Sequence, residues 1–104
     1  MKENRRDWRT WKGDRTIKEF WRGVLRSVSD QQEDILVAIA DKLLQPKEIA
    51  NKVNTSQQTV SSQLGKLYEL ELVDNIQFGR NTYYHVKEDA LIEILIEKCA
   101  EREQ

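Results

Sequence analysis

The sequence predicts a mainly α fold of about five helices that carries one small β-hairpin. Residues 46–70 divide into a short helix, a tight polar break at Asn54-Thr55 and a longer helix that opens at Ser56. A run of β-forming residues follows, with the turn residues Gly79-Arg80-Asn81 at its centre. This order of elements is typical of a winged helix-turn-helix, which lays one helix in the major groove of DNA.

Length and composition describe a small protein with one core. The 104 residues have room for a single domain, and 34% charged with 38% hydrophobic residues is ordinary for a soluble, helix-rich chain. No apolar stretch approaches the ~20 residues that span a bilayer, and residues 1–15 lack the apolar centre of a signal peptide. We therefore expect a cytoplasmic protein that does not enter a membrane.

Cys99 and His85 are the single cysteine and the single histidine of the chain. They cannot form an intramolecular disulfide or a tetrahedral Cys/His zinc site, so we expect no metal and no cofactor. No Ser-His-Asp spacing, phosphate-binding glycine loop or paired-carboxylate site is recognisable, and His85 lies in a β-forming run. The sequence therefore favours a protein that is not an enzyme.

Basic charge is concentrated at the N-terminus. Residues 1–27 hold nine Lys/Arg against four Asp/Glu, whereas residues 28–104 hold eight against fourteen. We divide the chain into a basic arm over residues 1–15 and a winged-helix domain over residues 16–104. Two uses of the arm stay open, because its Trp8 and Trp11 can stack on a nucleic acid or fold back on the domain or a second subunit.

Apolar spacing predicts the helices that precede the turn. From Thr16 an amphipathic helix runs to Val28, and Ser29 or Asp30 caps a second helix that extends to Gln45. Pro46 then begins the short helix, because proline suits a first helical turn. The expected core residues of the second and third helices are Ile35, Leu36, Ile39, Leu43, Leu44, Ile49, Ala50 and Val53.

The helix that opens at Ser56 carries the expected DNA-reading surface. Its inward positions are Val60, Leu64, Leu67 and Leu70, and its outward positions are Gln57, Gln58, Ser61, Ser62, Gln63 and Lys66. That outward face has no acidic residue before Glu69, and glutamine and serine side chains can hydrogen-bond to base edges. We predict base contacts from Gln57, Gln58, Ser61 and Ser62. Predicted phosphate, wing and arm contacts are Lys47, Thr55, Ser56, Lys66, Arg80, Asn81, Arg5, Arg6 and Arg9.

The last helix, from Lys87 onward, is apolar over more than one narrow stripe. One apolar side can seal the domain, and the excess width predicts a self-association surface shared with the first helix. An unusually deep core helix is the alternative. The predicted dimer-interface residues are Phe20, Trp21, Leu91, Ile92, Leu95 and Cys99.

Two motifs resemble those of the ArsR/MarR-type winged-helix transcription regulators. The run Ser56-Gln-Gln-Thr-Val-Ser-Ser-Gln-Leu64, followed by Leu67 to Val73, is similar to the family's recognition helix and its exit into the wing, and Tyr83-Tyr84 resembles the aromatics that close the wing. The resemblance implies a homodimer on a palindromic operator, with recognition helices ~34 Å apart. Glu71 stands where the family often has glycine, and because a non-glycine residue adopts a left-handed cap only with strain, we expect the exit from the recognition helix to differ locally.

Departures from the family pattern argue against metal sensing. Metal-sensing relatives carry cysteines near the recognition helix, or histidine and acidic ligands on the last helix, and here those positions hold glutamine, serine and isoleucine. The expected function is a dimeric, sequence-specific transcription regulator, a repressor, that binds double-stranded DNA. Two alternatives stay open, a winged-helix protein-interaction module and a chromatin-type or plasmid-encoded DNA binder with little sequence preference. The sequence identifies no small-molecule effector.

Overall fold

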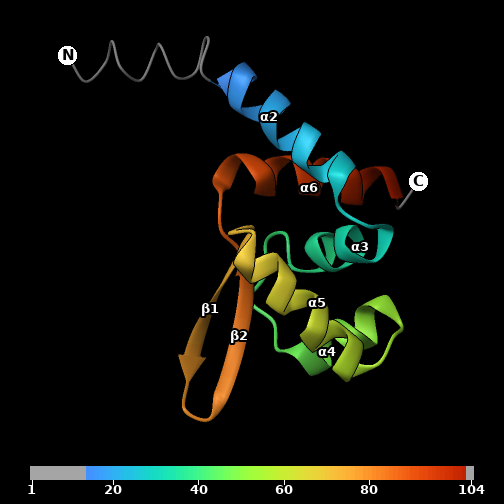
Figure 1. Ribbon diagram of the computed structural model, residues 1–104, viewed down its shortest axis with the longest axis vertical. Coiled ribbons are helices and arrows are strands. Elements are labelled where there is room, and N and C mark those ends of the chain that lie inside the picture. Colours follow the sequence, from blue (N-terminus) through green and yellow to red (C-terminus); the bar gives the residue numbers. More distant parts are fainter. Residues whose placement is uncertain (1–13, 103–104) are drawn as a thin grey trace, which may run out of the picture.

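The computed structural model describes residues 14–102, which form five helices and a two-stranded antiparallel hairpin. The elements are α2 Asp14–Ser27, α3 Asp30–Ala38, α4 Pro46–Val53, α5 Gln57–Glu69, β1 Val73–Phe78, β2 Asn81–Val86 and α6 Asp89–Arg102. The predicted fold, a mainly α winged helix-turn-helix, is therefore confirmed. Figure 1 shows α2 and α6 at one end of the molecule, whereas α4, α5 and the far end of the hairpin lie at the other.

Side-chain caps start the helices where the sequence predicts. The Ser29 hydroxyl accepts from the Gln32 amide at 3.1 Å, and the Gln32 side-chain oxygen accepts from the Ser29 amide at 3.0 Å. This capping box satisfies two amides that the first turn of α3 leaves without a helical partner. Pro46 is the first residue of α4, and the Glu48 carboxylate accepts from the Gln45 amide at 2.9 Å.

The second helix is shorter than predicted. α3 ends at Ala38, and the expected continuation to Gln45 is wrong. Leu44 instead pairs with Tyr84 of the hairpin, because its amide donates to the Tyr84 carbonyl at 3.2 Å and its carbonyl accepts from the Tyr84 amide at 2.8 Å. This segment therefore ties the base of the wing to the helices, and the neighbouring Leu43, predicted to be in the core, is exposed.

A single apolar core joins the helices to the base of the hairpin. Its fully enclosed side chains come from α3, α4, α5, α6 and the hairpin: Ile35, Leu36, Ile39, Ile49, Val60, Leu64, Leu67, Leu72, Val73, Leu91, Ile94 and Leu95. Leu70 was predicted to face inward, but it is exposed. The reason is that α5 ends at Glu69 and Leu70 is already its C-cap.

The exit from α5 and the turn of the hairpin both use left-handed backbone. Glu71 has φ 63, so it adopts the left-handed conformation although it is not glycine and the expected local difference is not seen, and Gly79 has φ 66. Gly79 is the first of the two residues, Gly79-Arg80, between Phe78 and Asn81, which face each other across the hairpin. A positive φ at the first turn position only is the pattern of a type II′ turn, which matches the twist of the flanking strands.

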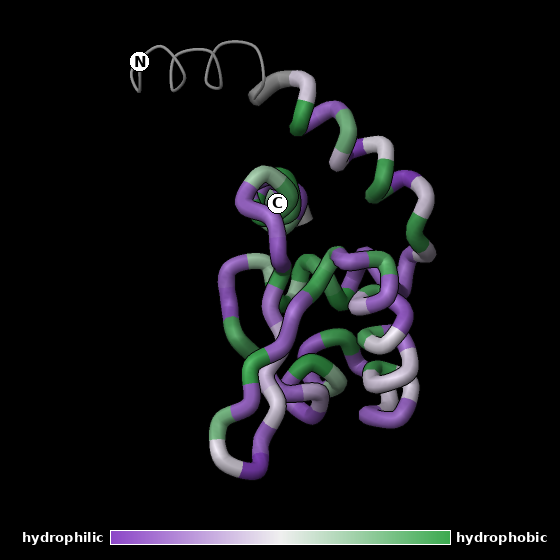
Figure 2. The backbone as a smooth tube through the Cα atoms, turned by 60° about the vertical axis from the view of Figure 1, so that its left-hand side comes forward, coloured by the Kyte–Doolittle hydropathy of each residue, from purple (hydrophilic) through white to green (hydrophobic). Residues whose placement is uncertain are grey.

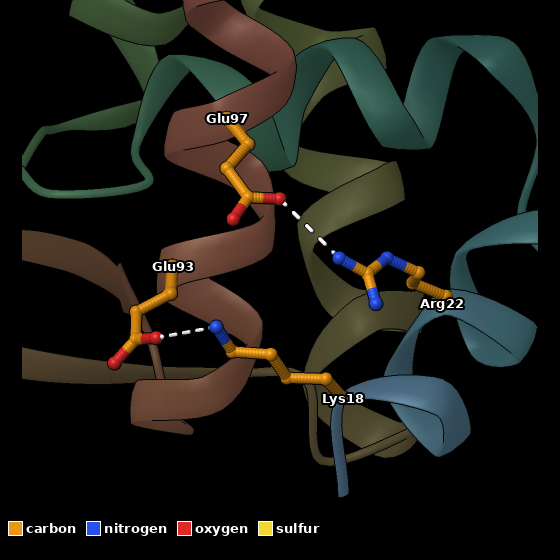
Figure 3. Close-up of polar contacts among 4 residues, drawn as sticks. All are labelled: Lys18, Arg22, Glu93 and Glu97. Atoms are coloured by element: carbon orange, nitrogen blue, oxygen red, sulfur yellow. Dashed lines mark hydrogen bonds and ion pairs between the residues drawn. The ribbon is translucent and has the colours of Figure 1, made fainter. Parts of the chain in front are cut away.

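The terminal helices α2 and α6 contact each other and cross at an angle (Figure 2). Lys18 pairs with Glu93 at 3.0 Å, and Arg22 pairs with Glu97 at 3.4 Å (Figure 3). Both partners advance by four residues, about one helical turn, so the contact advances in the same chain direction on both helices. Hydrophobic and hydrophilic residues alternate along α2 (Figure 2), as expected for an amphipathic helix with one side toward α6.

Candidate nucleic-acid interface

A tight turn joins the two helices of the helix-turn-helix. Asn54 adopts the left-handed conformation, with φ 58 and ψ 51, and its amide donates to the Ala50 carbonyl. The Thr55 amide donates to the same carbonyl at 3.1 Å. Asparagine tolerates this backbone better than most residues, so the predicted break at Asn54-Thr55 is confirmed and brings α5 close against α4.

Ser56 caps α5 with its side chain, as the sequence predicts. Its hydroxyl accepts from the Thr59 amide at 3.1 Å and donates to the Thr59 hydroxyl at 2.8 Å. The only proton of this hydroxyl is therefore already used within the helix. The side chain of Ser56 thus fixes the start of α5, and its phosphate contact stays a prediction.

The outward face of α5 lies almost as predicted. Its exposed side chains are Gln57, Gln58, Ser61, Ser62 and Lys66. Gln63 was grouped with them, but it is half-buried, and its amide nitrogen donates to the side-chain oxygen of Gln31 on α3 at 3.0 Å. Gln63 thus connects two helices inside the domain, and four neutral polar side chains and one lysine remain on the outward face.

The surface around this face contains no carboxylate over two long stretches. Residues 49–68 and 75–87 hold no aspartate or glutamate, although the whole chain has 18. These stretches cover most of α4, all but the last residue of α5 and most of the hairpin. Figure 1 shows α4, α5 and the hairpin tip at the same end of the molecule, so the acid-free segments form one end. A polyanion can approach that end without carboxylate repulsion.

The remaining predicted contacts lie at the edges of this end. Lys47 is exposed in the first turn of α4, Thr55 is half-buried in the turn, and Arg80 and Asn81 are exposed at the hairpin tip. The arm residues Arg5, Arg6 and Arg9, with Trp8 and Trp11, lie outside the described residues. The predicted helix and wing residues thus lie at one end of the molecule, and their contacts with DNA stay predictions.

The predicted dimer residues divide into two groups at the other end of the molecule. Phe20 is 61% exposed, and Trp21, Ile92 and Cys99 are half-buried. Leu91 and Leu95 are 0% exposed because they pack in the core of the domain, so their assignment to an intermolecular surface is wrong. Ile17 on α2 and Ile96 on α6 are not among the predicted dimer residues, although both are exposed large apolar side chains.

Other kinds of site find no support in the part of the chain that the structure describes. Within residues 14–102, no group of three or more His, Cys, Asp or Glu side chains is arranged to hold a metal ion. None of the described helices is both long and apolar enough to traverse a lipid bilayer.

A family model matches the centre of the chain. The model is that of the bacterial regulatory protein, arsR family, and it covers residues 29–75, from the cap of α3 to the middle of β1. Comparison with the curated proteins gives no significant match.

Solved structures agree with this match. ZitR of Lactococcus lactis, solved as the wild type in complex with DNA, is 26% identical, with a TM-score of 0.63 over 74% of this chain and 54% of that chain. The present chain therefore spans about half the length of ZitR. The transcriptional regulator HlyU of Vibrio vulnificus is 18% identical, with a TM-score of 0.69 over 93% of this chain and 96% of HlyU.

The chain also resembles the homodimeric winged helix-turn-helix DNA-binding domain of Mb0332 from Mycobacterium bovis. The identity is 17%, and the TM-score is 0.63 over 88% of this chain and 84% of that one. At these identities HlyU and Mb0332 show the fold alone, and the family model adds the sequence pattern. The chain therefore resembles the winged helix-turn-helix regulators of the ArsR/MarR type, and residues 29–75 are the part that matches the arsR family model.

Proposed function

We propose that the protein is a dimeric, sequence-specific DNA-binding transcription regulator that acts as a repressor. The observation that carries this proposal is the exposed amide and hydroxyl face of α5, placed at an end of the molecule where residues 49–68 and 75–87 contain no carboxylate. The ZitR complex with DNA supports it, because that chain shares the fold at 26% identity. Neither the fold nor the family is that of an enzyme, and we propose no catalysis.

The side chains of α5 have two different tasks in this proposal. Gln57, Gln58, Ser61 and Ser62 contact base edges in the major groove, because an amide can donate and accept together at an adenine. Lys66 on α5 and Lys47 on α4 hold phosphates on either side, with Arg80 and Asn81 at the wing. Phosphate contacts set the position of the protein, and only the base contacts distinguish sequences.

Two copies associate through their terminal helices. Phe20, Ile17 and Ile96 leave apolar surface exposed on α2 and α6, where a second copy would cover it. These helices lie at the end opposite to α4 and the hairpin tip, so this association leaves both α5 helices free (Figure 1). The homodimeric domain of Mb0332 has the same fold, which favours this arrangement.

A repressor function follows from occupancy. A dimer that spans a promoter excludes the transcription machinery from it, and a signal that weakens the dimer or its DNA contacts would release the gene. The cytoplasmic location stays a prediction.

The decisive experiment selects bound duplexes from random DNA with the purified protein and then compares variants on the selected site. Gln58→Ala should weaken binding by ~1–3 kcal/mol at one base pair and relax the preference there, whereas Lys66→Ala should weaken all sequences alike. An unchanged base preference in Gln58→Ala would contradict the base-reading role. Mass measurement in solution, with Phe20→Ala as the variant, tests the dimer.

A protein-interaction module is the second candidate, and the charge of the body favours it. Residues 28–104 hold eight basic against fourteen acidic residues, which disfavours a general attraction to DNA. Salt separates the two functions: an interface with several phosphates should weaken steeply between 50 and 200 mM salt, whereas an apolar protein interface should not. A selection that yields bound DNA without a common sequence would instead indicate a binder with little preference.

A further inference from the structure

The hairpin has two different faces. Val73 and Val86 face each other at its base and are buried, so the side of the hairpin that carries them points toward the core. Side chains alternate along a strand, which places Ile76 and Phe78 on the opposite side. Ile76 lies across from Tyr83, and Phe78 lies across from Asn81 beside the turn. An apolar ridge, Ile76 and Phe78, therefore runs along the outer side of the wing to its tip.

This ridge is strongly exposed. Phe78 is 75% exposed, the largest exposed fraction among the large apolar side chains of the described residues, and Ile76 is 46% exposed. An exposed phenylalanine contributes little to the core of its own domain, and it costs solubility. Its position one residue before the Gly79-Arg80 turn puts it beside the cation that the proposed function assigns to DNA.

Charge decides which partner fits the ridge. Residues 75–87 contain no carboxylate, and they include Arg80 at the tip, whereas Lys87 at the base of the hairpin pairs with Glu71 at 3.3 Å. A weakly basic surface without carboxylates suits a polyanion. The rest of the domain is acidic, so carboxylates are absent only from this part of it. A second copy does not need this face, because the exposed apolar surface of α2 and α6 lies at the other end of the molecule.

We infer that Phe78, supported by Ile76, packs into the minor groove of the bound duplex, next to Arg80. This inference rests on the proposed function. A thin β-ribbon with an apolar side chain at its tip fits the narrow minor groove, where such side chains contact sugars and the groove floor. There the guanine amino group is the feature that separates G·C from A·T pairs, and a phenyl ring cannot accept a hydrogen bond from it as a carbonyl would. Phe78 thus disfavours G·C pairs in the flank that the wing reaches.

The first test compares salt dependence. Phe78→Ala should weaken binding to the selected duplex roughly 5- to 100-fold, and the slope of log affinity against log salt should stay that of the wild type, because no phosphate contact is lost. Arg80→Ala should reduce that slope by about one. The matched control is Leu43→Ala, which removes another exposed apolar side chain, next to the base of the hairpin and not at its tip, and should bind like the wild type.

The second test identifies the groove. Flanks of A·T, G·C and inosine·cytosine pairs separate the two grooves, because inosine·cytosine resembles G·C in the major groove and lacks the minor-groove amino group. The wild type should bind A·T and inosine·cytosine flanks alike and G·C flanks roughly 5- to 50-fold more weakly. Phe78→Ala should lose most of this discrimination. Thermal unfolding should be the same in both proteins, since Phe78 is largely outside the core.

The outcomes separate this inference from the function on which it rests. If the wild type binds no duplex at low salt, the proposed function fails. If the wild type binds and Gln58→Ala shifts the base preference, while Phe78→Ala keeps both the affinity and the flank discrimination of the wild type, only the role of Phe78 is overturned. The same holds if G·C and inosine·cytosine flanks bind alike, because the discrimination then comes from the major groove.

Discussion

The two ends of this molecule use charge in opposite ways. At the end formed by α4, α5 and the hairpin, two stretches of sequence contain no carboxylate, and the exposed side chains of α5 are mostly neutral amides and hydroxyls. At the other end, α6 carries an acid in every turn, at Asp89, Glu93, Glu97 and Glu101. The net charge of -1 is therefore an average over two unlike surfaces.

The acids of α6 also change the meaning of the basic N-terminal third. Residues 1–27 hold nine Lys/Arg, but Lys18 and Arg22 are already paired with Glu93 and Glu97 of α6. These two cations hold helices together and are not free to neutralise phosphate. A charge count along the sequence therefore overstates the cations available to DNA when the fold brings acids beside them.

The largest expected effect tests the boundary between core and dimer surface. Leu95→Ala should reduce the free energy of unfolding by ~2–5 kcal/mol, because it removes a fully buried side chain. Phe20→Ala should change it much less and should weaken self-association instead, because Phe20 is mainly exposed. Chemical denaturation and mass in solution measure the two effects. Equal unfolding free energies for the two variants would place Leu95 outside the core after all.

The next prediction compares two substitutions that each add one negative charge, one at each end of the molecule. Ser62→Glu places a carboxylate on the acid-free face of α5 and should weaken DNA binding roughly 10- to 100-fold, because like charges at an interface repel. Ala100→Glu adds the same charge to an exposed position of α6, where it should leave DNA affinity nearly unchanged. Fluorescence anisotropy with a labelled duplex compares them. Equal losses would mean that net charge, and not its location, governs binding.

Local signals explain which parts of the fold the sequence predicts well. The break at Asn54, the cap at Ser56 and the Pro46 start depend on neighbours within one turn, and all three are confirmed. The end of α3 at Ala38 depends on Leu44, whose backbone pairs with Tyr84 forty positions later. A helical period in the sequence cannot reveal that competing strand contact.

The same distinction holds for the candidate site. Gln57, Gln58, Ser61 and Ser62 follow from the face of one helix, so the sequence alone places them outward. Gln63 turns inward because its partner, Gln31, approaches from another helix. Leu91 and Leu95 share the apolar character of the residues around them, and only the packing of α6 separates core positions from exposed ones.

A smaller effect on stability is expected at Glu71, which lies between α5 and β1. Glu71 has φ 63, where a side chain is strained and glycine is not, so Glu71→Gly should raise the stability by ~0.5–1 kcal/mol after the entropic cost of glycine. The contact of Glu71 with Lys87, at 3.3 Å, is exposed and offsets little of this gain. Thermal unfolding measures it. Glu71→Ala is the control, because it removes the carboxylate without relieving the backbone, and it should not stabilise the protein.

The smallest effect is that of the ion pairs between the terminal helices. A double-mutant cycle of Lys18→Ala and Glu93→Ala should give a coupling of ~0.2–1 kcal/mol in the free energy of unfolding, and less at high salt, because the Glu93 carboxylate is mostly exposed. The cycle isolates the pair from each residue's other contacts. The Glu93→Ala variant should bind DNA as the wild type does, because it removes a carboxylate at the end away from α5. Glu93→Ala could instead increase the DNA affinity by the same factor by which Ser62→Glu decreases it. The electrostatic field of the whole molecule would then govern affinity, and the separation of the two ends would have no functional meaning.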